Sequence, residues 1–191
     1  MAAGSARPGA ARWSDMFKRT LNLGLVYLLA AVVVLADQYS KHLVRTRLAL
    51  NTTWSPWPWL ASYVRVLHIQ NTGAAFGIFK EAGLFFTAVA VVVTLVIIVY
   101  SQRLPPGHWW MRIALGMQLG GALGNLVDRL VFGTVTDFIS VGNFAIFNVA
   151  DASISLGVVL LAVMMLFEGR AERGQSESGS TLPPVDVGET S

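Results

Sequence analysis

Three aspartates lie at the ends of long apolar stretches of the sequence, where an ionisable side chain is costly to bury. Asp37 ends the first stretch, Asp128 ends the third, and Asp151 begins the fourth. Two carboxyl groups held close together cannot both ionise cheaply, so they share one proton and their pKa values separate. The ionised member can then draw a proton from water while the protonated member donates one to a carbonyl oxygen. Such residues can hydrolyse a peptide bond as aspartic peptidases do, with no metal and no cofactor.

The polar residues around two of these aspartates recur at helical spacing. Asn125, Asp128 and Arg129 stand at positions i, i+3 and i+4, which places them on one face of a helix. Asn148 and Asp151 are also separated by a helical spacing and share a face in the same way. Because only a short loop joins the third and fourth stretches, the end of one should adjoin the start of the other. We therefore expect Asp128 and Asp151 to be neighbours.

Two structural explanations compete with this chemistry. An ion pair, either Asp128 with Arg129 or Asp37 with Lys41, can do no more than hold helices together. Glycines also recur at every fourth position of the third stretch, and such small residues let helices pack closely in a membrane. These glycines are Gly116, Gly120 and Gly124. Residue types and spacing by themselves leave both catalysis and helix packing open for the aspartates.

The composition indicates a membrane protein. Of the 191 residues, 54% are hydrophobic and only 13% are charged, against ~25% charged residues in an average soluble domain. The absence of cysteine excludes disulfides, iron–sulfur clusters and thiol catalysis, and the three histidines form no HExxH metal motif. A net charge of +3, spread along the chain, gives no reason to expect nucleic acid as a partner.

Four stretches are apolar enough to form membrane helices, each of which needs about 20 residues. The predicted spans are residues 20–38, 82–102, 110–130 and 148–167. Four spans place both termini on one side, which carries eight basic residues against six on the other side. The positive-inside rule therefore favours cytoplasmic termini and an active site near the outer face. The expected fold class is a mainly α membrane protein with four transmembrane helices.

The segment between the first two spans has a different pattern. Tyr63–Ile69 contains a mixture of β-branched and aromatic residues, which predicts a strand. Ala74–Phe79 can form a second strand that returns and pairs with it. We expect a small extracytoplasmic β-sheet there. The tails, residues 1–19 and 169–191, are predicted to be cytoplasmic, the first partly disordered and the second disordered. Residues 1–36 also fit a signal-peptide pattern, but the spans and motifs that follow favour an uncleaved first helix.

Five short motifs occur between residues 20 and 168. They are DQYSK at Asp37–Lys41, NTGAAFG at Asn71–Gly77, GNLVDR at Gly124–Arg129, VTDF at Val135–Phe138 and FNVAD at Phe147–Asp151. Any one of them is a weak signal, but five in order, at matching hydropathic positions, are specific. In these motifs the chain resembles the bacterial lipoprotein signal peptidases, also called signal peptidase II, a family of intramembrane aspartic peptidases.

The resemblance implies a role for each motif residue. Asp128 and Asp151 match the catalytic pair. The residues that match substrate-binding or site-lining positions are Asn71, Asn125, Arg129 and Asn148. The residues that match supporting structural positions are Asp37, Lys41, Asp137 and Gly124. The resemblance implies neither a metal ligand nor a cofactor.

The resemblance also implies a substrate and a location. A diacylglyceryl-modified prolipoprotein would be cut on the amino side of its lipid-modified lipobox cysteine. The partners would be this substrate and membrane lipid, and the enzyme would act as a monomer in the bacterial cytoplasmic (inner) membrane. Two other functions suit a small multi-spanning protein, a proton-coupled transporter and a non-enzymatic assembly factor. The expected gathering of carboxylates at one membrane face favours the peptidase over the transporter, which needs a path across the bilayer.

Overall fold

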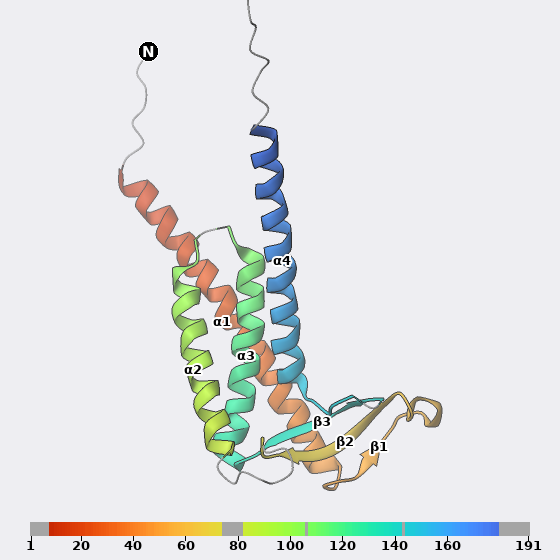
Figure 1. The fold of residues 1–191 in the computed structure, drawn as a ribbon. Coiled ribbons are helices and arrows are strands. Elements are labelled where there is room, and N and C mark those ends of the chain that lie inside the picture. Colours follow the sequence, from red (N-terminus) through yellow and green to blue (C-terminus); the bar gives the residue numbers. More distant parts are fainter. Residues whose placement is uncertain (1–7, 74–81, 106, 143, 180–191) are drawn as a thin grey trace, which may run out of the picture.

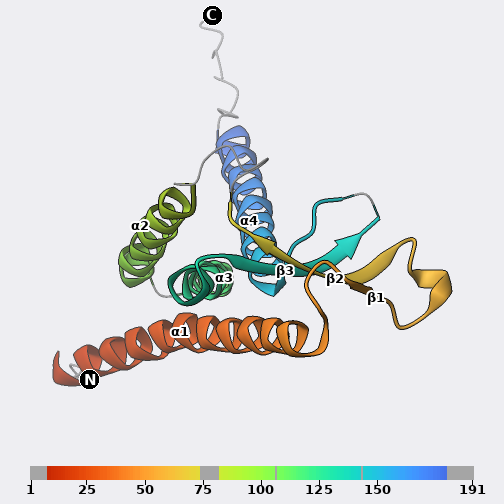
Figure 2. The ribbon, with the colours of Figure 1, turned by 90° about the horizontal axis from the view of Figure 1, so that it is seen from below.

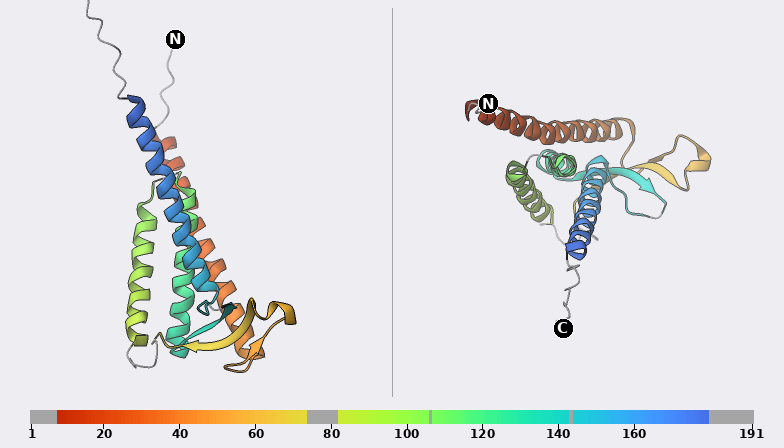
Figure 3. Two further views of the ribbon diagram at one scale, coloured as in Figure 1. Left: turned by 45° about the vertical axis from the view of Figure 1, so that its right-hand side comes forward. Right: turned by 90° about the horizontal axis from the view of Figure 1, so that it is seen from above.

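The computed structural model describes residues 8–73, 82–105, 107–142 and 144–179, which form long helices with a small sheet at one end (Figure 1). The helices are α1 (Pro8–Arg47), α2 (Ala82–Arg103), α3 (Trp109–Phe132) and α4 (Val149–Gly179). The start of α1 and the end of α4 lie at the opposite end of the molecule from the sheet (Figure 3). The segments that are long and apolar enough to cross a membrane are Leu23–Arg47, Gly83–Arg103 and Val149–Phe167. The protein is thus mainly helical and suited to a membrane.

Helix α3 packs against α1, α2 and α4, and glycines make this packing close (Figure 2). A Cβ atom added at Gly120 would lie 2.6 Å from Val33 Cβ on α1. A Cβ atom added at Gly121 would collide with the carbonyl oxygen of Ala150 on α4. Because neither position carries a side chain, both neighbouring helices approach the α3 backbone. The glycine pattern of the third stretch therefore serves helix packing.

Helix α2 contrasts with α3 because it is apolar around its whole circumference. Large side chains such as Leu84, Leu95 and Val96 are exposed along it. A helix of this kind is stable in hydrocarbon, where exposed apolar side chains carry no penalty. We therefore place α2 at the lipid-facing side of the helices, with α3 as its main protein contact.

The sheet consists, among the described residues, of the antiparallel strands β1 (Thr53–Trp54), β2 (Val64–Asn71) and β3 (Val135–Val141), in that order. The strand predicted at Tyr63–Ile69 is confirmed as β2, whereas Ala74–Phe79 lies outside the described residues. The prediction that the sheet belongs only to the segment between the first two helices is wrong, because β3 comes from the connection between α3 and α4. Local patterns do not reveal which distant strand will pair, since pairing depends on tertiary packing.

The first and last helices extend beyond the predicted spans. Helix α1 begins at Pro8, within the tail 1–19 that is predicted to be partly disordered. Helix α4 continues to Gly179, within the predicted disordered tail 169–191. Proline suits the first turn of a helix, and neither extension contains a later proline that would break it. Hydropathy marks the part of a helix that crosses a membrane and carries little information about where the helix ends. The remaining parts of both tails lie outside the described residues.

Candidate active site

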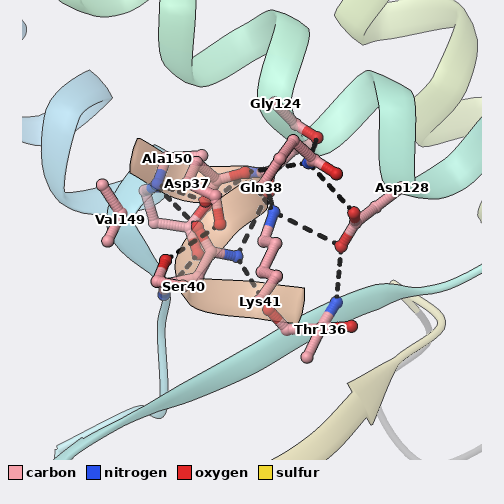
Figure 4. A network of polar contacts seen from close by, with 12 residues as sticks. Asp37, Gln38, Ser40, Lys41, Gly124, Asp128, Thr136, Val149 and Ala150 are labelled. Atoms are coloured by element: carbon pink, nitrogen blue, oxygen red, sulfur yellow. Dashed lines mark hydrogen bonds and ion pairs between the residues drawn. The ribbon is translucent and has the colours of Figure 1, made fainter. Parts of the chain in front are cut away.

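Lys41 lies at the centre of a buried polar network (Figure 4). Its ammonium nitrogen is 2.7 Å from Asp37 Oδ2, one helical turn away on α1, and 3.3 Å from Asp128 Oδ2 on α3. The same nitrogen donates a hydrogen bond of 2.9 Å to Asn125 Oδ1. The side chains of Lys41, Asp37 and Asp128 are all 0% exposed. Buried charges are tolerated when they are paired, so these three groups hold one another in place.

Both oxygens of the Asp128 carboxylate have several partners. Oδ1 accepts a hydrogen bond from Gln38 Nε2 at 3.1 Å and lies 3.4 Å from Arg45 Nη1. Oδ2 accepts a hydrogen bond from the backbone N–H of Thr136 at 2.9 Å, in addition to its contact with Lys41. Asp128 therefore ties α3 to α1 and to the start of β3, and its charge is balanced by two cations (Figure 4).

The carboxylate of Asp37 joins α1 to the start of α4. Its Oδ1 accepts a hydrogen bond of 2.9 Å from the backbone N–H of Ala150, in the first turn of α4. A Cβ atom at Gly124 would lie 2.6 Å from Asp37 Oδ2, so the missing side chain at Gly124 leaves room for this carboxylate. Asp37, Lys41 and Gly124 thus occupy positions where they hold three helices together.

Asp137 lies on β3 and is held by two amides. Its Oδ1 accepts a hydrogen bond of 2.7 Å from Asn148 Nδ2, and its Oδ2 accepts one of 2.9 Å from Asn71 Nδ2. The side chain has no cation within ion-pair distance among the described residues, and Asp137 is only 3% exposed. Burial raises the pKa of Asp137, and repulsion from the Asp151 carboxylate acts in the same direction. The environment therefore favours the protonated form of Asp137.

Asp151 is positioned by the N-terminal turn of α4. Asn148, immediately before the helix, accepts a hydrogen bond of 3.0 Å from the Asp151 N–H through its Oδ1. In return, Asp151 Oδ2 accepts a hydrogen bond of 3.3 Å from the Asn148 N–H. This reciprocal pair is a capping box, formed here by Asn and Asp at the required spacing of three residues. The local sequence Asn148-x-x-Asp151 thus fixes both side chains at the helix start.

Asn125 and Asn148 connect the aspartates. Asn125 Nδ2 donates a hydrogen bond of 2.7 Å to Asp151 Oδ1, and Asn148 contacts both Asp151 and Asp137. Asp128 and Asp151, which the sequence predicts to be neighbours, share no hydrogen bond in the described part of the chain. They are connected through Lys41 and Asn125, and also through Thr136 and Asn148. Asp137 and Asp151, in contrast, contact the same residue: the side chain of Asn148 donates to the Asp137 carboxylate and its backbone N–H donates to the Asp151 carboxylate.

Arg129 and Asn71 complete the predicted set. Arg129, half-buried on α3, is attracted electrostatically to Asp151, Asp137 and Asp128. Asn71 is exposed at the end of β2, and its Oδ1 accepts a hydrogen bond of 2.8 Å from the N–H of Gly73.

Sequence reasoning did not identify three partners of the buried network. Gln38 donates hydrogen bonds to Asp37, Asp128 and the carbonyl oxygen of Gly124. Arg45 and Thr136, joined by a hydrogen bond of 3.1 Å, both contact Asp128. The sequence contained one signal for Arg45. It follows Asp37 and Lys41 at a spacing of four residues, which places the three side chains on one face of a helix.

Comparison with known proteins gives consistent matches. The sequence profile of the family described as Signal peptidase (SPase) II matches residues 29–167. A lipoprotein signal peptidase of Moorella thermoacetica is 40% identical over 141 residues, which cover 73% of this chain and 92% of the relative. A lipoprotein signal peptidase of Bacillus subtilis is 37% identical over 156 residues, which cover 79% of this chain and 99% of the relative.

Two solved structures of bacterial membrane enzymes have a similar fold. The first, at 2.3 Å resolution, is 27% identical, has a TM-score of 0.68, and covers 85% of this chain and 95% of its own. The second, at 1.9 Å resolution, is 29% identical, has a TM-score of 0.69, and covers 75% of this chain and 93% of its own. Since the family profile spans most of its length and curated relatives reach 40% identity, the chain belongs to the signal peptidase II family.

Proposed function

We propose that this protein removes the signal peptide from diacylglyceryl-modified prolipoproteins by cleaving on the amino side of the lipid-modified cysteine. Family membership and relatives named lipoprotein signal peptidase support this activity. The observation that carries the mechanism is that one residue, Asn148, contacts the carboxyl groups of both Asp137 and Asp151. Two carboxyl groups in such an arrangement suit acid–base hydrolysis.

The geometry favours Asp137 over Asp128 as the partner of Asp151. The Asp128 carboxylate is fully buried and neutralised by Lys41 and Arg45, so it has no free oxygen to serve a reacting water. Asp137 has only neutral amide partners among the described residues, and it lies close enough to Asp151 to feel its charge. We therefore revise the sequence-based pair and assign Asp128 to the supporting network.

The two aspartates would divide the work according to their surroundings. Because burial raises the pKa of Asp137, this residue suits the acid that donates its proton to the carbonyl oxygen and regains it when the tetrahedral intermediate collapses, while the proton that the base takes from water passes to the leaving amine. Asp151 is half-buried at the N-terminus of α4, where the helix dipole favours negative charge, so it suits the base that activates water.

Neighbouring side chains would hold this pair in position. Asn71, Asn125 and Asn148 each donate to one of the carboxylates, which orients their lone pairs. Arg129 would stabilise negative charge as it develops near Asp151, since it is already attracted to that carboxylate. The packing of the helices next to the site would depend on Asp37, Lys41 and Gly124.

A membrane domain of residues 20–168 with four spanning helices accommodates this function. The central helix α3 has 24 residues, or ~36 Å at about 1.5 Å per residue, which is enough to cross ~30 Å of hydrocarbon. We propose that both termini, with the tails 1–19 and 169–191, are cytoplasmic, that the site lies near the outer face, and that the protein acts as a monomer. Asp137 lies on β3, Asp128 accepts a hydrogen bond from the backbone of the same strand, and Asp151 lies in the first turn of α4. This gathering next to the sheet supports cleavage at a membrane surface more than proton transport across it (Figure 1).

The test is cleavage of a diacylglyceryl-modified prolipoprotein by purified protein in detergent. We expect Asp137→Asn and Asp151→Asn to lower the rate by about 10²–10⁴-fold, because asparagine preserves shape but cannot transfer the proton. Asp128→Asn should lower thermal stability while its folded fraction still cleaves. Asp15→Asn, in the N-terminal segment away from all five motifs, is the matched control.

The cleavage rates of these variants identify which two aspartates are catalytic. If Asp137→Asn cleaved at the normal rate and folded Asp128→Asn were inactive, the pair would be Asp128 and Asp151, as the sequence predicts. Inactivity of the wild-type protein on the lipid-modified precursor would overturn the peptidase function itself.

A further inference from the structure

A groove of about 610 Å³ is lined by residues from the last turns of α1 and from the sheet. Its apolar wall is formed by Leu43, Val44, Leu48, Trp54, Val66 and Phe138. None of these residues belongs to the aspartate site or its supporting network. A pocket of this size with a mainly hydrophobic lining is typical of sites that bind an elongated apolar ligand.

The groove offers almost nothing to a polar ligand along its length. The hydroxyl of Ser40, also in the wall, donates its hydrogen bond of 2.9 Å to the carbonyl oxygen of Asp37 in its own helix. Trp54 and Val66 face each other in the β1–β2 register and so form one continuous apolar side. Leu43 is 37% exposed and Trp54 is 56% exposed, which leaves the groove open to the surroundings along its edge.

One cation stands at the groove without a partner. Arg47 lines it and is exposed, and it has no ion pair or hydrogen bond with any residue that the structure describes. The neighbouring cations are already occupied, since Lys41 pairs with Asp37 and Asp128, and Arg45 pairs with Asp128. An anionic ligand group at this end of α1 would therefore find Arg47 available.

The depth of the groove in a bilayer suits a lipid. The apolar segment Leu23–Arg47 has 25 residues, or ~37 Å at about 1.5 Å per residue, against ~30 Å of hydrocarbon. Arg47, at the end of this segment, therefore reaches the headgroup region, while Leu43 and Val44 stay beside the acyl chains. The groove thus places an apolar channel next to hydrocarbon and a free cation next to phosphate.

We propose that this groove binds one phospholipid of the leaflet at the sheet end, with an acyl chain along Val44 and Val66 and its phosphate on Arg47. Charge favours a phospholipid over the acyl chains of the substrate, because the diacylglyceryl group carries no phosphate for Arg47 to bind. A bound phospholipid would fill the space between α1 and the sheet. This site goes beyond the proposed peptidase activity and does not depend on it.

The experiment uses the full chain in nanodiscs that contain phosphatidylglycerol with a photoreactive diazirine on one acyl chain. Mass spectrometry of the labelled protein should find the groove residues modified several-fold more than Val92 and Val96, which are exposed on α2. Arg47→Ala and the groove-filling variant Leu43→Trp should each reduce groove labelling several-fold. Arg103→Ala, an exposed arginine at the end of α2, should leave it unchanged.

Two results would overturn the proposal. Equal labelling of the groove and of α2 would mean that the protein contacts only bulk lipid. Groove labelling that is unaffected by Arg47→Ala but removed by excess lipid-modified precursor would mean that the substrate's acyl chain is the occupant. Precursor cleavage, measured on the same samples, should stay at the wild-type rate in all three variants and reports separately on the peptidase activity.

Discussion

The side chain of Asn125 links the buried ion pairs to the aspartate site by hydrogen bonds. Its Oδ1 accepts hydrogen bonds from Lys41 Nζ at 2.9 Å and from Asn148 Nδ2 at 3.1 Å. Two donors on the oxygen fix the orientation of the amide, so the nitrogen must face Asp151, to which it donates at 2.7 Å. The charge of Lys41 therefore acts on Asp151 through Asn125 without contacting it.

Removal of the Lys41 charge should destabilise the protein strongly. Lys41→Met leaves the buried carboxylates of Asp37 and Asp128 without their shared cation, and breaking a buried pair costs about 3–5 kcal/mol. We expect a correspondingly lower thermal midpoint in detergent, measured by tryptophan fluorescence. The matched control is His42→Ala, an exposed neighbour on α1, which should unfold close to the wild-type temperature.

A second variant separates charge from packing. Asp37→Asn in the Lys41→Met background removes the carboxylate charge that has lost its only ion-pair partner among the described residues, whereas Asp128 keeps Arg45, and should recover part of the lost stability. If the double variant were no more stable than Lys41→Met, the loss would come from packing and the ion-pair explanation would fail.

At the scale of the elements, the glycine positions of α3 determine how closely the helices meet. A Cβ atom at Gly116 would lie 3.0 Å from the carbonyl oxygen of Val26, and one at Gly120 would lie 2.7 Å from that of Ala30. These close approaches keep α1 near α3, which is what allows Lys41 to reach Asp128 and Asn125. The close packing of the glycines and the polar network are therefore parts of one arrangement, and the catalytic role of the aspartates stays a prediction.

Gly120→Ala should weaken this packing. The new methyl group would meet backbone and a β-branched side chain, neither of which can move easily, so we expect a loss of about 1–3 kcal/mol. Thermal unfolding in detergent measures it. Gly24→Ala on α1 is the matched control, because a Cβ atom there has nothing within 4 Å and alanine favours a helix by up to ~1 kcal/mol. Equal stabilities of the two variants would contradict the close α1–α3 contact.

At the scale of the whole molecule, the sheet and the polar site share one end, whereas the start of α1 and the end of α4 share the other (Figures 1 and 3). With the four spans that we propose, this arrangement places the site and the termini on opposite sides of the membrane. The absence of cysteine from the sequence makes the arrangement directly testable, since every introduced thiol is the only one in the protein.

Single cysteines should report the topology. With a membrane-impermeant maleimide on intact spheroplasts, we expect Ser62→Cys, on the exposed β1–β2 connection, to be labelled. Arg103→Cys, at the end of α2, and Thr181→Cys, near the C-terminus, should be labelled only after permeabilisation. Labelling of position 181 from outside would contradict four spans, because α4 would then end on the same side as the sheet.

The features of the fold that depend only on residues close together in the chain could be predicted from the sequence alone. Hydropathy located the helices, β-branched residues located β2, and the spacing Asn148-x-x-Asp151 already contained the capping box that starts α4. The five motifs identified the family, because each motif is a short local string. The roles of their polar residues stay predictions. Among these residues, residue types do not distinguish one aspartate from another.

The proposed choice of catalytic aspartates rests on contacts between distant segments. Asp128 is surrounded by groups from distant segments, such as Gln38, which is 90 positions away, and Arg45, which is 83 positions away. Asp137 meets Asn71 only because β3 pairs with β2. The charge state and freedom of a carboxyl group depend on its neighbours in space, and long-range pairing supplies those neighbours. A local pattern contains no information about them, which is why the sequence led to Asp128 while the geometry favours Asp137.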